Sequence, residues 1–155
     1  MRRSLRFAVA TALLAGLVLG TGSVAAANRG HHKILDVPLT GLAVKGTVIA
    51  GFAGAGHAWA IDEGNAKLFS DGRLLINVEG LVLAPEGTNP VGSGTGVVSC
   101  NGGATAADIV RSLPVPLSIP DGDGHVNQWL TLPSPCLNPV IFFASATGGW
   151  FATSG

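Results

Sequence analysis

The stretch IPDGDGHVNQW, residues 119–129, holds the densest group of side chains that could do chemistry. Asp121 and Asp123 match the first two ligands of the calcium-loop pattern D-x-[DN]-x-[DN]-G-x5-E. The third ligand, the glycine and the closing glutamate of that pattern are all replaced. Calcium takes about six to eight oxygen ligands, so Asp121 and Asp123 are only weak candidates for a metal site.

The same stretch has the composition of a tight turn. Pro120 fixes its own φ angle, and the two Asp-Gly pairs tolerate left-handed backbone. Val126 then begins an extended run. We therefore predict a turn between two strands at this position.

No catalytic motif is recognisable elsewhere. The sequence contains neither HExxH nor G-x-S-x-G, and its glycine-rich stretches lack the spacing of phosphate-binding loops. Asp62 and Glu63 are adjacent, and adjacent strand residues point to opposite faces, which separates them as a glycosidase pair. His57 and His125 stand alone. The sequence predicts no catalytic residue and no cofactor.

Aromatic side chains that could stack on a ligand are few. The chain has no tyrosine, and Trp59, Trp129 and Trp150 are its only tryptophans. Tryptophan buries a large apolar area, so we expect all three to pack in the core or at its rim.

The first 27 residues predict export. Three arginines precede 14 uncharged residues, Phe7 to Gly20, and the small residues Ala25 to Ala27 follow. This is the layout of a cleavable signal helix; the Arg2-Arg3 pair leaves open a twin-arginine route beside general secretion. No later apolar stretch reaches the roughly 20 residues of a membrane span. We expect a secreted, extracellular protein without a stable membrane anchor.

The net charge of the chain restricts the classes of macromolecule that it can bind. Residues 28–155 carry six basic and nine acidic side chains, a net charge of −3. A nucleic-acid-binding protein normally has a basic patch, and none is visible. The length fits one domain. We predict a flexible tail over 28–33 and a single monomeric domain over 34–155.

Two cysteines lie in this part of the chain. An even cysteine number in an exported protein indicates a disulfide, here between Cys100 and Cys136. Such a loop closure stabilises by roughly 3–4 kcal/mol in the chain-entropy model. Neither cysteine belongs to a CxxC pair or has a nearby histidine, which disfavours a metal or redox role.

The clearest structural pattern spans residues 65–84. Asp71-Gly72 favours a tight hairpin turn. After it Leu74, Ile76 and Val78 alternate with more polar residues, which is the period of a half-buried strand. Gly80 allows a kink before a last short run. Further strands are predicted over residues 42–53, 58–62, 96–100, 109–119, 126–132, 140–144 and 150–153, and a single helical turn capped by Thr105 is an alternative over 105–110.

Many short strands with frequent turns predict an all-β fold, an antiparallel β-sandwich of immunoglobulin-like or jelly-roll-like architecture. Trp129 lies too close to Cys136 for the Cys–Trp–Cys spacing of immunoglobulin domains. Pro114 and Pro116 place their segment at a sheet edge. The apolar run over 140–146 is expected to be a central, covered strand.

The segments EGLVLAPEGTNPV, VVSCNGG, LPVPLSIPDGDGHVNQWLTLPSPCLNPVIFF and GGWFATSG carry a resemblance. Over about residues 57–155 the chain resembles a group of small, uncharacterised, secreted bacterial proteins. The resemblance implies a β-rich domain with one disulfide and no particular activity.

These observations predict a secreted, non-enzymatic β-sandwich that acts as an extracellular binding or structural module. Two alternatives stay open. One is a secreted hydrolase whose site forms only in three dimensions, with His57 or His125 beside a buried carboxylate and a serine. The other is a calcium-stabilised module that uses Asp121 and Asp123.

Overall fold

The computed structural model describes residues 31–155, and these form an all-β fold with several antiparallel sheets. The predicted signal segment 1–27 lies outside the described residues. A four-stranded sheet has the order β1-β6-β7-β12, with bounds Lys33–Pro38, Glu63–Phe69, Arg73–Glu79 and Gly124–Trp129.

The second large sheet has the order β10-β9-β13-β14-β2, and β11 also pairs with β9. Its strands are β10 (Ile109–Arg111), β9 (Ser93–Ser99), β13 (Val140–Ala144), β14 (Trp150–Thr153), β2 (Thr40–Gly41) and β11 (Val115–Pro116). Two small sheets pair β3 (Val48–Ile49) with β4 (Phe52–Ala53) and β5 (Trp59–Ala60) with β8 (Val82–Leu83). Short 3-10 turns are η1 (Asn101–Gly103) and η2 (Ala106–Asp108).

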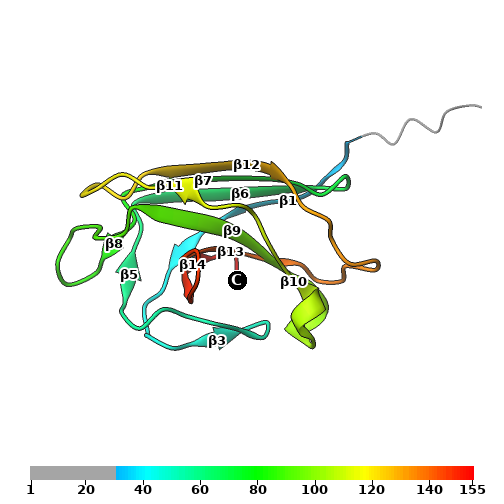
Figure 1. The fold of residues 1–155 in the computed structure, drawn as a ribbon, viewed down its shortest axis with the longest axis horizontal. Helices are drawn as coiled ribbons and strands as arrows, with labels where there is room; N and C mark the ends of the chain where they lie inside the picture. Colours follow the sequence, from blue (N-terminus) through cyan, green and yellow to red (C-terminus); the bar gives the residue numbers. More distant parts are fainter. Residues whose placement is uncertain (1–30) are drawn as a thin grey trace, which may run out of the picture.

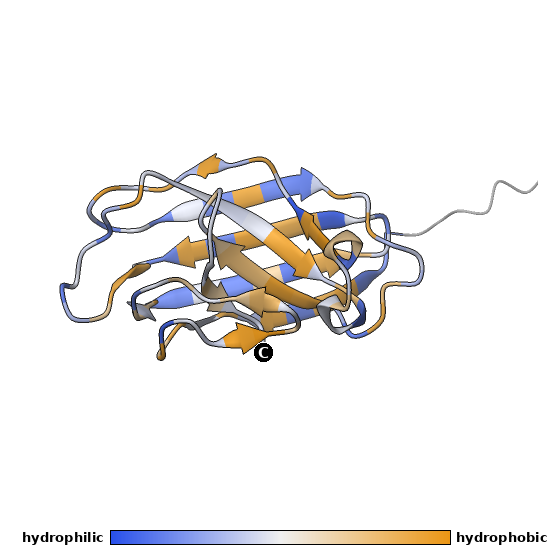
Figure 2. Ribbon diagram, turned by 60° about the horizontal axis from the view of Figure 1, so that its bottom comes forward, coloured by the Kyte–Doolittle hydropathy of each residue, from blue (hydrophilic) through white to orange (hydrophobic). Residues whose placement is uncertain are grey.

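The two large sheets lie in two layers. In Figure 1 the layer of β12, β7, β6 and β1 lies above β9, β13, β10 and β14, and Figure 2 shows hydrophobic residues along strands of both. Gly96 of β9 lies close to the facing layer, because a Cβ there would lie 2.7 Å from Leu74 and 3.1 Å from Ile76 of β7. The core therefore fills the space between the layers, where Leu74, Ile76, Phe142 and Phe143 are fully buried.

The predicted hairpin is confirmed. β6 and β7 pair around Asp71-Gly72, and Gly72 has a φ of 83°. Leu74, Ile76 and Val78 are fully buried, whereas Asn77 and Glu79 are exposed. The alternation therefore leaves one face of the four-stranded sheet, which we call the outer face, open to solvent.

Most other strand predictions are right in place and wrong in length. β13 is central, between β9 and β14, and is covered as expected. Segment 109–119 is broken because Ser112 Oγ accepts the Gly96 N–H at 2.9 Å; its second part, β11, lies at a sheet edge as its prolines require. The predicted strand 42–53 is instead a small hairpin, since Ala50 and Gly51 both have positive φ. A single turn with Thr105 as its N-cap is present, as the alternative over 105–110 expected, but η2 ends at Asp108, and Ile109 and Val110 belong to β10.

The predicted disulfide is also confirmed. Cys100 and Cys136 are bonded, with Cα atoms 4.9 Å apart. The bond ties the end of β9 to the segment that connects β12 with β13. Asn101 reinforces this link, because its side chain donates to the Pro135 carbonyl and accepts the Leu137 N–H.

Candidate functional site

The segment 119–129 forms a turn, as predicted, and then β12. The Ser118 N–H donates to the Asp123 carbonyl at 2.9 Å and the Gly122 N–H donates to the Ser118 carbonyl at 2.9 Å. Gly122 has a φ of 81° and lies against the Leu81 backbone. β12 begins at Gly124, two residues earlier than predicted.

Asp121 and Asp123 lie at one end of the outer face. They line a cleft together with Asp62, Glu63 and Glu79, which we call the acidic cleft. Asp123 Oδ1 accepts the Gly80 N–H at 3.0 Å. Over residues 31–155, however, no three or more His, Cys, Asp or Glu side chains are grouped closely enough to hold a metal ion.

The hydrolase alternative requires a histidine beside a buried carboxylate and a serine. His57 and His125 are exposed. The buried carboxylate of Asp108 is instead bonded by the Asn101 amide at 2.7 Å and the Thr105 hydroxyl at 2.8 Å. These two bonds, Asn101 first, hold the pKa of Asp108 below its ordinary value.

The three tryptophans have different environments. Trp59 and Trp150 are buried against Phe151 and Phe142, as predicted, and the Trp150 indole donates to the Phe52 carbonyl. The packing prediction is wrong for Trp129, whose side chain points to the outer face and whose exposed fraction is 64%. The reason is strand parity: Val126 points inward, so Trp129, three residues later, points outward.

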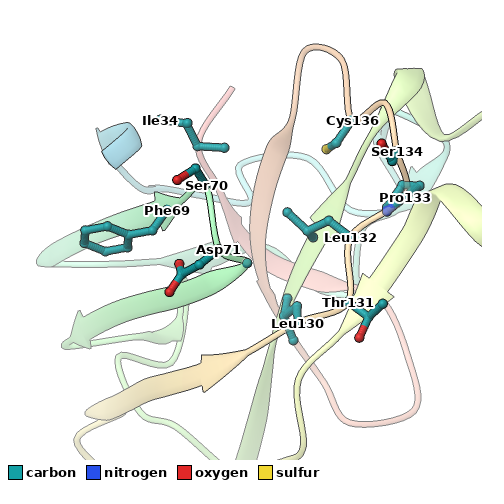
Figure 3. Close-up of a pocket in the computed structure, with 11 residues that line it drawn as sticks. Ile34, Phe69, Ser70, Asp71, Leu130, Thr131, Leu132, Pro133, Ser134 and Cys136 are labelled. Carbon is teal, nitrogen blue, oxygen red and sulfur yellow. The ribbon is translucent and has the colours of Figure 1, made fainter. Parts of the chain in front are cut away.

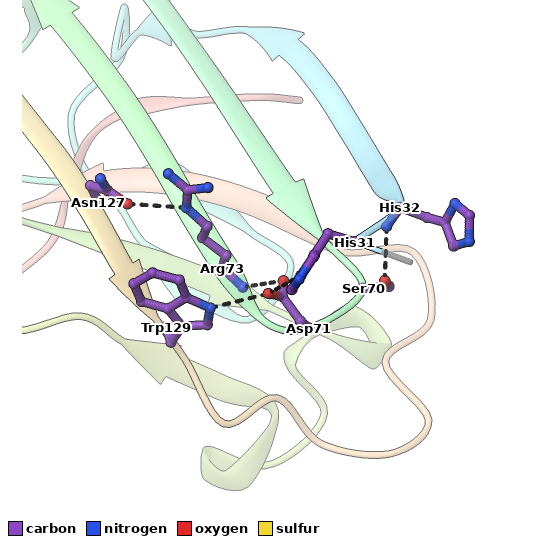
Figure 4. Close-up of polar contacts among 7 residues, drawn as sticks. All are labelled: His31, His32, Ser70, Asp71, Arg73, Asn127 and Trp129. Carbon is purple, nitrogen blue, oxygen red and sulfur yellow. Dashed lines mark hydrogen bonds and ion pairs between the residues drawn. The ribbon is translucent and has the colours of Figure 1, made fainter. Parts of the chain in front are cut away.

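Trp129 is held by neighbouring side chains despite its exposure (Figure 4). Its Nε1–H donates to Asp71 Oδ2 at 3.1 Å. The guanidinium of Arg73, its cross-strand partner, lies 5.3 Å from the indole centroid and 5.7 Å from the Phe69 centroid. Arg73 Nε also donates to Asn127 Oδ1 at 3.2 Å. We call Phe69, Asp71, Arg73, Asn127 and Trp129 the tryptophan platform.

Asp71 is the acceptor at the centre of the platform. Its carboxylate accepts the Arg73 backbone N–H at 3.1 Å and contacts His31 Nδ1 at 2.8 Å, in addition to Trp129. These hydrogen bonds, with the Arg73 N–H as the largest cause, lower the pKa of Asp71 below its usual range. Asp71 is therefore a carboxylate at neutral pH, with its orientation fixed.

The start of the described chain lies against the same turn. His32 donates its N–H to Ser70 Oγ at 3.2 Å and accepts the Ser70 N–H at 2.8 Å. β1 begins at Lys33. The last residues of the predicted tail 28–33 are thus placed beside the platform.

A second cleft adjoins the platform (Figure 3), and we call it the turn cleft. It has a volume of about 600 Å³. One wall comes from Ile34 and the β6–β7 turn, and the other from residues 130–134 and Cys136. Phe69 and Asp71 belong to both the cleft and the platform, so the two form a continuous surface.

The tryptophan platform was not predicted, although the sequence carries one signal for it. The alternation that placed Val126 inside also predicts His125, Asn127 and Trp129 outside, on one face. The remaining partners are distant in sequence; Asp71 and Trp129 are separated by 58 residues.

Over residues 31–155 no helix is long and apolar enough to cross a membrane. Comparison of the chain with protein-family models, curated proteins and solved structures finds no match.

Proposed function

We propose that this protein is a secreted, monomeric, non-enzymatic binding module, and that the tryptophan platform with the adjoining turn cleft is its ligand surface. The observation that carries the proposal is the exposed indole of Trp129, fixed in orientation at a water-facing surface. Tryptophan is among the residue types enriched at the positions that carry most of the binding energy of interfaces, and Trp129 adjoins a cleft lined by Phe69 and the exposed Ile34.

Preorganisation supports a binding role. Binding costs about 0.5–1.5 kcal/mol for each flexible side chain that becomes immobilised. The hydrogen bond to Asp71 and the contact with Arg73 already restrict Trp129 in the free protein. A ligand that stacks on the indole therefore loses little of its binding energy to ordering the surface.

The β-sandwich architecture and export belong to the same proposal. Two antiparallel layers with one core between them support a sandwich. The leader composition of residues 1–27 and the Cys100–Cys136 disulfide support an extracellular location.

The indole N–H resonances of the three tryptophans provide the test. We expect a screen of sugars, peptides, lipids and nucleotides against ¹⁵N-labelled protein to find compounds that shift the Trp129 resonance, assigned with Trp129→Phe. The buried Trp150 indole, bonded to the Phe52 carbonyl, is the internal control. Compounds that shift only His57 or His125 and are chemically converted would favour the hydrolase alternative and contradict the proposal.

A further inference from the structure

The outer face beyond Trp129 carries side chains that both donate and accept hydrogen bonds. Asn77 is paired directly with Asn65 on β6 and with His125 on β12, and Leu75 is paired with Asn127. These side chains alternate with buried neighbours and so point outward. An amide has two N–H donors and an oxygen acceptor. Asn77 uses one donor on Glu79 and Asn127 uses its oxygen on Arg73, so the Asn77 oxygen and the Asn127 NH₂ group match hydroxyl groups of a ligand.

The indole of Trp129 is prepared for stacking. Its one polar group, Nε1–H, is already satisfied by Asp71, so the apolar ring surface is what remains to interact. The guanidinium of Arg73 lies over the ring and bonds to Asn127, while 64% of Trp129 stays exposed to a ligand. The result is a flat aromatic surface that is bordered by polar groups, which suits a pyranose ring with its apolar C–H face and equatorial hydroxyls.

Charge selects among ligands that stack. Near Trp129 the guanidinium of Arg73 lies over the indole ring and donates to Asn127, and the Asp71 carboxylate accepts the indole N–H. At the opposite end of the face the acidic cleft carries Asp62, Glu63, Glu79, Asp121 and Asp123. A polyanion that extended from Trp129 along the strands would meet these carboxylates, and like charges in close contact are unfavourable. The acidic cleft thus disfavours nucleic acids and acidic polysaccharides that extend along the whole face, whereas an uncharged chain meets no such repulsion.

We propose that the outer face binds a neutral polysaccharide, with one sugar ring stacked on Trp129 and the following units lying along β7 and β12 toward Asn77 and His125. This inference rests on the proposed binding function and names its ligand class. The bound chain lies over Leu75 and Asn127 between these two ends.

Acrylamide quenching of tryptophan fluorescence tests the inference, because Trp129 is exposed and Trp59 and Trp150 are buried. The probes are cellohexaose, laminarihexaose, mannohexaose and chitohexaose, each added to the full chain. The charged and apolar comparisons are hexagalacturonate, a thymidine hexanucleotide and phosphatidylcholine vesicles. We expect at least one neutral hexaose to protect Trp129 from quenching and none of the three comparisons to do so.

The position of the bound sugar chain is then tested by calorimetric titration of protein variants with the hexaose that protects Trp129. Trp129→Ala should weaken binding about tenfold or more, the scale found for planar rings stacked on aromatic side chains, whereas Trp129→Phe keeps a ring and most of the affinity. Asn77→Ala should weaken binding of the hexaose and leave the corresponding disaccharide unaffected. Val48→Ala, an exposed site on β3, is the matched control and should change nothing.

The outcomes separate the ligand class from the binding function. Protection by hexagalacturonate, the hexanucleotide or vesicles alone overturns the polysaccharide and leaves the platform as the ligand surface. Protection by none of the neutral hexaoses also overturns the inference. Protection that rises with protein concentration and needs no probe identifies a second copy as the occupant, which overturns both this inference and the proposed monomeric module.

Discussion

The two ends of the outer face use carboxylates in opposite ways. At the platform end one carboxylate, Asp71, receives donors from Arg73, Trp129 and His31. At the other end five acidic residues line one cleft, and Glu63 lies directly opposite Glu79. A carboxylate surrounded by donors orders its neighbours, whereas carboxylates that face each other repel. At one end of the sheet the Asp71 carboxylate therefore fixes the orientation of neighbouring side chains. At the other end the acidic cleft repels anions.

The largest effect on stability should follow loss of the disulfide. One of its cysteines, Cys136, lies on the wall of the turn cleft. Cys100→Ser combined with Cys136→Ser should lower the free energy of unfolding by about 2–4 kcal/mol, measured by urea denaturation. Hydrogen exchange should increase most in residues 130–137 beside the platform. An equal increase at the acidic cleft would remove the proposed contrast between the two ends.

The next effect concerns Asp71. Asp71→Asn removes the charge that accepts three donors, so the Tm at pH 7 should fall by a few degrees. The pKa of Asp71 is lowered in the folded state, so its stabilisation is full above the unfolded value of about 3.9. That stabilisation is lost as the pH falls through the lower, folded pKa. The Tm difference between wild type and variant should therefore narrow on acidification, and a constant difference from pH 7 to pH 2 would contradict this role.

A smaller effect of opposite sign is expected at the other end. Glu63→Gln removes one of two like charges that face each other across β6 and β7. Relief of the repulsion should raise the free energy of unfolding by about 0.2–1 kcal/mol, and the gain should shrink in high salt. Lys67→Gln, on the same strand and face, is the matched control and should not stabilise. A destabilised Glu63→Gln would mean that Glu63 has a favourable partner.

The smallest effect concerns calcium. The described acidic side chains are not grouped closely enough to hold a metal, so thermal melts in calcium and in chelator should give the same Tm. Asp121→Asn combined with Asp123→Asn is the comparison variant. A Tm raised by calcium in wild type and unchanged in this variant would establish the calcium-stabilised alternative.

Local patterns in the sequence predicted what depends on neighbouring residues. The Asp71-Gly72 hairpin, the alternation of Leu74, Ile76 and Val78, and the edge position of Pro116 follow from turn geometry, side-chain period and a missing N–H. The disulfide followed from cysteine number and compartment. Strand lengths were less predictable, because positive φ angles such as that of Ala50 carry no sequence signal.

Local sequence patterns could not predict the tryptophan platform, for a physical reason. The platform needs β12 to pair with β7 in the register that sets Trp129 opposite Arg73, and a register between distant strands is decided by the whole core. A tryptophan in an isolated strand pattern is also compatible with burial, since its apolar area favours the interior. Only the alternation counted from the buried Val126 indicated that Trp129 is exposed and not buried.

The contact between His31 and Asp71 has a practical consequence for handling the protein. An affinity tag or fusion partner joined just before His31 would emerge beside the platform and compete with any ligand for access. The carboxyl end follows β14, in the opposite layer (Figure 1). Attachment through Gly155 therefore keeps the outer face clear, and surface-immobilised assays should be oriented in that way.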